Sequence, residues 1–356
     1  MKALITAGGR GTRLRPLTHT QNKHLIPVAN KPILQYALDT VREAGITEVG
    51  IVVGVDNGQE VVDWLGDGSR LGLKVQYVWQ EAPLGLAHVV KISEDFIGDD
   101  PFVFYLGDNI VVGGIQRFVD RFHEDGVDCC LTLARVRDPE RFGVPEFGAD
   151  GKITGVVEKP SEPKSPYAVS GIYIYGPAIF KAVNAIEPSP RGELEISDAH
   201  DWLLKNGYKV GHDEITGWWK DTGMPGDLLE ANRLVLSKAD ERIEGSVDGT
   251  SDIAGAVIIE EGAEIIASKV RGPAIIGKGA KVVDSYVGPY SAIGADCRLE
   301  SCEVEYSILM DRVVVKETDV RIEGSLLGND VEIVRSSGKP RVQRFILGEQ
   351  SRVELI

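Results

Sequence analysis

A glycine-rich segment followed by two cations is the clearest chemical signal in the chain. The segment reads GGRGTR from Gly8 to Arg13 and directly follows a short apolar stretch at residues 2–7. Glycines let backbone N–H groups approach an anion closely, and the guanidinium of Arg13 fits phosphate oxygens. Lys23 follows ten residues after Arg13. The pattern predicts a site for a nucleoside triphosphate, and the alternative is a solvated basic loop.

The spacing of this segment excludes two familiar phosphate motifs. A dinucleotide fingerprint would need a glycine where Arg13 stands, and a P-loop would need a lysine followed by serine or threonine at its end.

Two separated carboxylates could complete the site with a metal ion. Asp108 follows an apolar stretch at residues 101–106, where a buried carboxylate is costly unless it meets a cation. Asp221 lies in a later loop, close to Gly223. Magnesium prefers oxygen ligands and often shares phosphate oxygens, so we expect Mg²⁺ to bind Asp108 and Asp221. For each aspartate the alternative is an ordinary turn or helix cap.

A third signal places an acceptor and a cation side by side in Glu158-Lys159-Pro160. Taken alone, this tripeptide is typical of a surface turn.

Strand-like and helix-like patterns alternate along the first 240 residues. We expect strands at 2–7, 48–53, 74–79 and 101–106, and helices at 32–44, 58–65 and 85–92. This alternation indicates an α/β fold with a Rossmann-like, mostly parallel sheet covered on both faces. Ligands in such folds bind at the carboxyl ends of the strands, which are the ends followed by Gly8 and by Asp108.

A different periodicity begins after Arg242. Apolar residues recur at spacings of five or six, and three steps add up to 17 residues, as from Ile276 to Ile293 to Met310. The recurring positions are Val270, Ile276, Val282, Val287, Ile293, Leu299 and Val304. This repeat predicts a left-handed parallel β-helix, with a β-sandwich as the alternative. We therefore expect a catalytic domain at 1–242, ending in a linker helix near 227–239, and a β-helix domain at 243–356.

Composition excludes several classes of function. Lys and Arg number 39 against 54 Asp and Glu, a net charge of −15, and neither part of the chain is basic, so we expect no nucleic-acid partner. The four cysteines, Cys129, Cys130, Cys297 and Cys302, lack zinc spacing. With neither a signal peptide nor a membrane span apparent, we expect a cytoplasmic protein without a membrane partner. The exposed faces and open ends of a β-helix favour a homo-oligomer.

The motifs together resemble the sugar-phosphate nucleotidylyltransferase family, and within it the longer glucose-1-phosphate thymidylyltransferases that carry a β-helical tail. The first block runs from Gly8 to Thr18, followed by Lys23 and by NKP at 30–32. Further blocks follow in family order: QEAPLGLA at 80–87, LGDN at 106–109, VEKP at 157–160, GELEISD at 192–198 and GWWKDTG at 217–223. These blocks span about residues 1–235.

The resemblance implies the substrates dTTP and glucose-1-phosphate, the cofactor Mg²⁺, and a role for each matching residue. The implied catalytic residues are Arg13, Lys23, Asp108, Lys159 and Asp221. The implied nucleotide-binding residues are Ala7, Gly8, Gly9, Gly11, Thr12, Arg13, Lys23, Gln80, Pro83, Gly85 and Asp108. The implied sugar-phosphate-binding residues are Asn109, Gly143, Glu158, Lys159, Val169 and Trp219.

Three alternatives remain open at this point. The same reaction could use UTP or another nucleotide, because one methyl group on the base is worth only about 1–3 kcal/mol. An acyltransferase role for the β-helix would need a histidine base, and the six histidines all precede residue 213. A non-catalytic regulatory relative would tend to lose the metal carboxylates or lysines, which this chain keeps.

Overall fold

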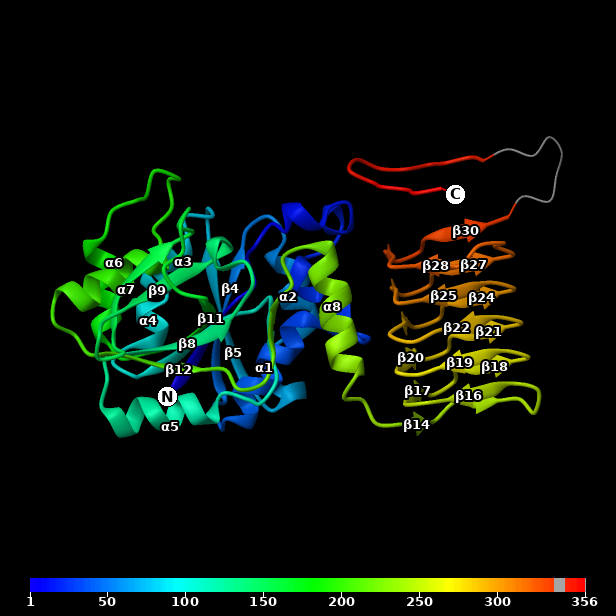
Figure 1. The fold of residues 1–356 in the computed structure, drawn as a ribbon, viewed down its shortest axis with the longest axis horizontal. Coiled ribbons are helices and arrows are strands. Elements are labelled where there is room, and N and C mark those ends of the chain that lie inside the picture. Colours follow the sequence, from blue (N-terminus) through cyan, green and yellow to red (C-terminus); the bar gives the residue numbers. More distant parts are fainter. Residues whose placement is uncertain (336–342, 356) are drawn as a thin grey trace. The chain divides into compact units, whose positions relative to one another are not determined.

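The computed structural model describes residues 1–335 and 343–355 (Figure 1). Its contacts divide the chain into two compact units. The first unit comprises Met1–Arg10, Gln21–Leu25 and Ile33–Asp221. The second comprises Gly11–Thr20, Ile26–Pro32 and the chain from Thr222 onward. A single boundary between residues 242 and 243 would leave these two N-terminal segments in the first domain. That domain boundary stays a prediction.

A seven-stranded sheet forms the centre of the first unit, in the order β12-β8-β11-β6-β1-β4-β5. Neighbouring strands are parallel except around β11, which runs antiparallel to both β6 and β8. The mostly parallel sheet is therefore confirmed. Its strands are β1 (Lys2–Thr6), β4 (Glu48–Gly54), β5 (Lys74–Gln80), β6 (Phe102–Leu106), β8 (Cys129–Arg135), β11 (Tyr167–Tyr175) and β12 (Val210–Glu214).

Helices cover both faces of this sheet. Successive side chains of β1 point to opposite faces, so Ala3 and Ile5 join one buried cluster and Leu4 joins another. The first cluster includes residues of α1 (Ile33–Glu43), α2 (Gly58–Leu65) and α5 (Gln116–Asp125). The second includes residues of α3 (Leu86–Ile92), α6 (Ala178–Ala185) and α7 (Ile196–Lys205), and α4 (Glu94–Ile97) follows α3. No helix in the described residues is long and apolar enough to cross a membrane.

Three short strand pairs lie outside the central sheet. In the first unit, β9 (Gly143–Phe147) pairs with β10 (Ile153–Glu158), and β7 (Asn109–Val111) pairs with β13 (Trp219–Asp221). In the second unit, β2 (Pro27–Val28) pairs with β3 (Lys31–Pro32). These small pairs matter because several of the predicted site residues lie on them.

The second unit contains one long helix and three parallel sheets. Helix α8 (Pro225–Leu236) begins at a proline, a residue that suits the first turn of a helix. The expected helix at 227–239 is thus present, but it begins two residues earlier and ends three residues earlier than expected. One sheet holds β14 (Arg242–Ile243), β17 (Val257–Ile259), β20 (Ala274–Ile276), β23 (Ala292–Ile293), β26 (Ile308–Leu309) and β29 (Leu326–Leu327). The next holds β15 (Ser246–Val247), β18 (Glu264–Ile266), β21 (Lys281–Val283), β24 (Arg298–Glu300), β27 (Val314–Lys316) and β30 (Glu332–Val334). The third holds β16 (Asp252–Ala254), β19 (Lys269–Arg271), β22 (Tyr286–Val287), β25 (Glu303–Glu305) and β28 (Ile322–Glu323).

These sheets form the predicted parallel β-helix, and all seven recurring apolar positions are fully buried. The 17-residue register holds where Ile276 pairs with Ile293. It is wrong for the next coil, because Ile293 pairs with Leu309, sixteen residues on, rather than with Met310. Both Leu309 and Met310 are buried, so apolar periodicity alone could not choose between them. Between the paired residues, the segment at 305–307 is one residue shorter than the corresponding segment at 288–291.

Candidate active site

The turn after β1 brings the side chain of Lys23 against the glycine-rich segment. A Cβ atom added to Gly9 would lie 2.5 Å from Lys23 Cε and 2.9 Å from its Nζ. A side chain at residue 9 would therefore displace the lysine. Asn22 fixes the backbone next to Lys23, because its amide group donates to the carbonyl oxygens of Ala7 and Asn57, each at 3.2 Å.

Lys23 and Asp108 form an ion pair. Lys23 Nζ donates to Asp108 Oδ2, and each side chain is only 15% exposed. Asp108 occupies the turn between β6 and β7, where the N–H of the preceding residue, Gly107, donates to the Thr6 carbonyl of β1 at 3.1 Å. The ion pair supports the prediction that the Asp108 carboxylate meets a cation, and the Gly107–Thr6 bond holds the turn that carries this carboxylate against β1.

Charge in this part of the site is fixed at neutral pH. Burial alone would raise the pKa of Asp108, but the charge and hydrogen bond of Lys23 hold that pKa below its usual value. Burial and the charge of Lys23 lower the pKa of His24 to about 3, so its imidazole is neutral. The site therefore presents one carboxylate, one ammonium group and one neutral ring.

A cavity of about 220 Å³ opens beside this pair. It gathers the predicted nucleotide-binding residues Gly8, Gly9, Lys23, Gln80, Pro83, Gly85 and Asp108. It also includes residues that were not predicted, namely Thr6, His24, Val52, Leu86, Val89, Leu106 and Glu193. Val52 and Leu106 lie near the carboxyl ends of β4 and β6, so the strand pattern could have suggested them. Ala7 is buried directly before the glycines, and its N–H donates to the Val52 carbonyl at 2.7 Å.

Gly85 lies where the loop after β5 touches the backbone of Leu194. Its φ is +99°, and an added Cβ would lie 2.4 Å from the Leu194 carbonyl oxygen. The Leu194 N–H donates to the Leu84 carbonyl at 2.8 Å, and the Ala87 N–H donates to the Leu194 carbonyl at 3.0 Å. The two loops that meet here both contribute residues to the cavity.

Gly85→Ala is therefore expected to lower the free energy of unfolding by about 2 kcal/mol, because the backbone is strained and the Leu194 contact is displaced. Urea unfolding measures this loss. Gly226→Ala is the matched control, since a Cβ at Gly226 meets nothing within 4 Å. An equal effect of both substitutions would contradict the close approach at Gly85.

A second group of predicted residues meets on the β9–β10 pair. Gly143 and Glu158 are register partners, and the Lys159 N–H donates to the Phe142 carbonyl at 2.9 Å. Lys159 has a φ of +44° and its Nζ lies 3.2 Å from Glu158 Oε1. The structure thus brings Gly143, Glu158 and Lys159 together.

Two residues that the sequence did not single out also hold Glu158. Ser197 Oγ donates to Glu158 Oε2 at 2.8 Å, and Arg191 Nη2 lies 3.6 Å from Glu158 Oε1. Both belong to or adjoin the GELEISD block, which was a signal that could have found them.

The β7–β13 pair connects Asp108 with Asp221. Asp221 lies opposite Asn109 in this pair, and Asn109 is the residue after Asp108. Asn109 Nδ2 donates to Asp108 Oδ1 at 2.9 Å. Within the described residues, Asn109 Oδ1 is buried without a hydrogen-bond partner. The pairing brings the backbones of the two predicted metal ligands close to each other.

The donor set can be tested against a magnesium ion. No group of three or more His, Cys, Asp or Glu residues suited to a metal occurs in the part of the chain that the structure describes. Two carboxylates fit Mg²⁺ when substrate phosphates and water fill the other positions. Asp108 and Asp221 therefore suit an ion that arrives with a nucleotide better than a permanently held metal.

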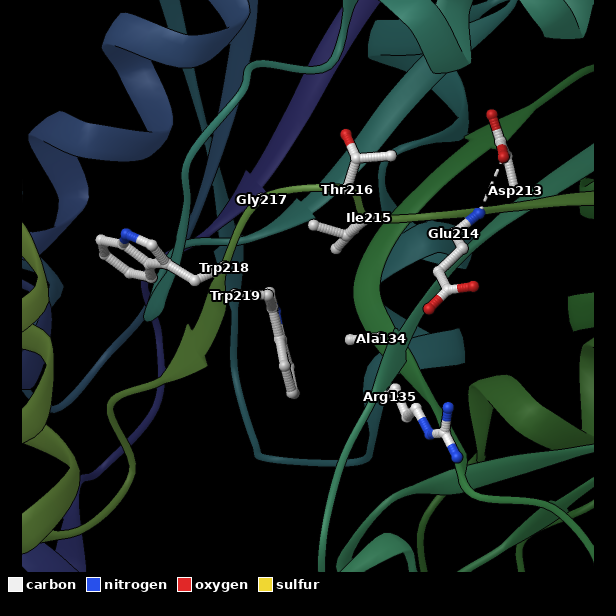
Figure 2. Close-up of a pocket in the computed structure, with 9 residues that line it drawn as sticks. All are labelled: Ala134, Arg135, Asp213, Glu214, Ile215, Thr216, Gly217, Trp218 and Trp219. Atoms are coloured by element: carbon white, nitrogen blue, oxygen red, sulfur yellow. Dashed lines mark hydrogen bonds between the residues drawn. The ribbon is translucent and has the colours of Figure 1, made fainter.

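Trp219 lines a larger cavity of about 660 Å³ (Figure 2). Its ring packs edge-to-face on Phe142, with ring centroids 5.4 Å apart. Figure 2 shows Trp219 extending between the loop at residues 215–218 and Arg135, while Trp218 turns the other way. Phe142 precedes Gly143, so Trp219 lies next to the second group of residues. Val169 is buried on β11 opposite Leu133 and belongs to the same buried cluster as Val156 of β10.

The remaining predicted residues, Gly11, Thr12 and Arg13, lie in the second unit. Thr12 and Arg13 belong to one short 3-10 helix, Thr12–Leu14, which starts after Gly11. Thr18 Oγ1 donates to the Gly11 carbonyl at 2.7 Å and closes the loop on itself. The roles of these three residues stay predictions.

The fold agrees with comparisons to known proteins. The family model described as nucleotidyl transferase matches residues 2–238. The chain belongs to this nucleotidyl transferase family, which confirms the resemblance found in its motifs.

Individual relatives within this family are similar to the chain along its whole length. The chain is 50% identical over 355 residues to a glucose-1-phosphate thymidylyltransferase of Streptomyces griseus, covering 100% of this chain and 99% of the relative. It is 48% identical to a protein of the same name from Streptomyces antibioticus, covering 100% and 99%. Among solved structures, a candidate glucose-1-phosphate thymidylyltransferase from Bacillus anthracis in complex with a sucrose has a TM-score of 0.62 and 41% identity, covering 65% of this chain and 94% of that one.

Proposed function

We propose that this protein transfers the thymidylyl group of dTTP to glucose-1-phosphate, forming dTDP-glucose and pyrophosphate. The observation that carries the proposal is the Lys23–Asp108 ion pair, lining one cavity with the glycine-rich turn and the Gln80–Gly85 loop. The two Streptomyces relatives, similar along their whole length, bear the name of this activity.

The proposed chemistry is a direct displacement at phosphorus. An oxygen of the glucose-1-phosphate group attacks the α-phosphorus of dTTP, and the bond from that phosphorus to the β-phosphate oxygen breaks. Because the nucleophile is already an anion, no general base is needed. Catalysis then consists of positioning two anions and offsetting their charge.

Each cation has a place in this proposal. Lys23 would contact the α-phosphate, Lys159 the attacking phosphate, and Arg13 the leaving end of the triphosphate. Asp108 and Asp221 would hold Mg²⁺, which when bound would neutralise charge on the phosphate oxygens. The pairing of Asp221 beside Asn109, together with the two-carboxylate donor set, supports this ligand assignment.

Base selection is assigned to the loop after β5. Gln80 Nε2 lies 3.1 Å from His88 Nδ1, so the amide of this nearly buried residue has a fixed orientation in the cavity wall. A fixed amide suits recognition of a pyrimidine edge by hydrogen bonds. The 5-methyl group separates dTTP from UTP by only about 1–3 kcal/mol, so UTP is the second candidate substrate.

The sugar phosphate is assigned to the group around Glu158. The Glu158 carboxylate accepts a hydrogen bond from Ser197, lies 3.6 Å from Arg191 and suits sugar hydroxyls, and Lys159 beside it suits the phosphate. The unpartnered Asn109 Oδ1 is a further acceptor for a sugar hydroxyl. Gly143, Val169 and Trp219 complete the proposed sugar site.

Pyrophosphate release from glucose-1-phosphate tests the proposal, with dTTP, UTP, GTP and ATP in parallel, each with Mg²⁺ and with excess EDTA. We expect the highest kcat/KM with dTTP and no release in EDTA. Preference for UTP would move the proposal to the second substrate. Failure with all four would contradict it and favour a regulatory binding role. A homo-oligomer and a cytoplasmic location also remain predictions from the sequence.

A further inference from the structure

Two N-terminal segments share a compact unit with the β-helix, although α8 and the coils follow them by some 200 residues. We call Gly11–Thr20 the loop segment and Ile26–Pro32 the hairpin segment. The loop segment carries Arg13. Sequence patterns gave no reason to connect either segment with the repeats, so their contacts inside the second unit need an explanation.

Asn232 of α8 joins the hairpin segment to the β-helix with one side chain. It is fully buried. Its Oδ1 accepts from the Ala29 N–H at 2.9 Å, and its Nδ2 donates to the Tyr290 carbonyl at 2.8 Å. Ala29 and Tyr290 both have positive φ angles, so the amide satisfies two backbone groups at sharp bends. A buried bridge of this kind fixes the distance between the two bends.

Two further contacts add to the Asn232 bridge. Asn30 Nδ2 donates to the Ile293 carbonyl on β23 at 2.8 Å. In the loop segment, Leu17 Cδ2 lies 3.3 Å from the position that a Cβ on Gly328 would take. Gly328 directly follows β29, the last strand of its sheet. The hairpin segment therefore bonds to the coil at Ile293, and Leu17 of the loop segment lies beside a different coil at Gly328.

The loop segment is itself closed. Thr18 Oγ1 and the Leu14 N–H both donate to the Gly11 carbonyl, at 2.7 and 2.8 Å, and Leu14 is buried. A closed loop held at Leu17 cannot move Arg13 freely. These two bonds are local, and Leu17 beside Gly328 is the point at which the loop segment approaches the coils.

We infer that the β-helix unit positions the nucleotide-binding loop, with Asn232 as the positioning residue that links α8, the hairpin segment and the coil at Tyr290. This inference rests on the proposed function, in which Arg13 contacts the triphosphate of dTTP. It assigns the β-helix a part in the reaction rather than only in assembly.

Hydrogen exchange on the full-length Asn232→Ala protein, without substrate, tests the positioning directly. Losing two buried hydrogen bonds is expected to speed amide exchange in residues 11–20 and 26–32 by about tenfold. Asn184→Ala is the matched control, because Asn184 Nδ2 donates to the Phe180 carbonyl at 2.9 Å within α6 alone. Unchanged exchange in both segments would overturn the inference.

Steady-state kinetics on the same proteins test the consequence. We expect Asn232→Ala to raise KM for dTTP about five- to tenfold and to leave KM for glucose-1-phosphate within about twofold. Faster exchange with both KM values moving equally would overturn the positioning role. Hydrogen exchange is measured without substrate and needs no catalytic activity. An error in the proposed substrates would therefore change the kinetic result and leave the exchange result unaffected.

Asn30→Gly is the second variant if Asn232→Ala does not fold. Asn30 has a φ of +59°, which glycine adopts readily, so the substitution removes only the hydrogen bond to Ile293. We expect the same direction of change in exchange and in KM for dTTP, at a smaller size. A protein identical to wild type in both measurements would overturn the inference.

Discussion

Asp108→Asn is expected to lower kcat by at least about a hundredfold, the effect typical of losing one preorganised charge in an active site. The carboxylate is the partner of Lys23 and accepts from Asn109, so its loss also leaves a largely buried ammonium group without its counter-charge. In the proposed reaction the substitution removes one of two metal ligands as well. Pyrophosphate release at saturating substrates measures the loss.

Asp100→Asn is the matched control for this prediction. Asp100 also pairs with a lysine, Lys2, at 3.2 Å, but it is half-exposed and lies outside both cavities. We expect its activity to equal that of wild type. Circular dichroism separates loss of catalysis from loss of fold in the Asp108 variant. An Asp108→Asn protein that is folded and within threefold of wild-type activity would sink the assignment.

Lys159→Ala is expected to lower kcat/KM for glucose-1-phosphate by about a hundredfold, while KM for dTTP changes little. Lys159 is held at a positive φ by the hydrogen bond from its N–H to Phe142, and its ammonium lies against Glu158. The removed cation would otherwise offset the charge of the attacking phosphate. Initial rates at varied glucose-1-phosphate measure the change.

Lys152→Ala is the control for Lys159, because Lys152 is an exposed lysine of the turn between β9 and β10 that pairs with Asp150. The removal of a distant surface charge should leave both KM values unchanged. If Lys159→Ala altered KM for dTTP as much as that for the sugar phosphate, Lys159 would not be specific to the sugar-phosphate side.

Local sequence signals were sufficient for much of this fold. Apolar stretches and helical patterns predicted the helices and the strands that end at or just before Gly8, Gln80 and Asp108 to within one or two residues. A buried aspartate at a strand end needs a cation, and Lys23 supplies it. The inward positions of the β-helix followed from spacing, because each coil must bury one apolar side chain per face.

The rest depended on information that spacing does not contain. Leu309 and Met310 are adjacent and both buried, so only the length of the preceding turn decides which one pairs with Ile293. The bridge from Ala29 to Asn232 spans 203 residues and involves a backbone N–H, which no side-chain motif can reveal. Arg191 lies near Glu158 only because the fold brings these distant parts of the sequence together.

The most direct test of the account is a ³¹P NMR time course of purified protein with Mg²⁺, dTTP and glucose-1-phosphate, with the Asp108→Asn protein beside it. We expect the resonance of glucose-1-phosphate to be replaced by the paired resonances of a sugar nucleotide, in step with pyrophosphate, and we expect the variant to show neither product. Pyrophosphate appearing with dTMP and no sugar nucleotide would mean hydrolysis instead of transfer. That result, or no reaction by the wild-type protein, would contradict the central claim.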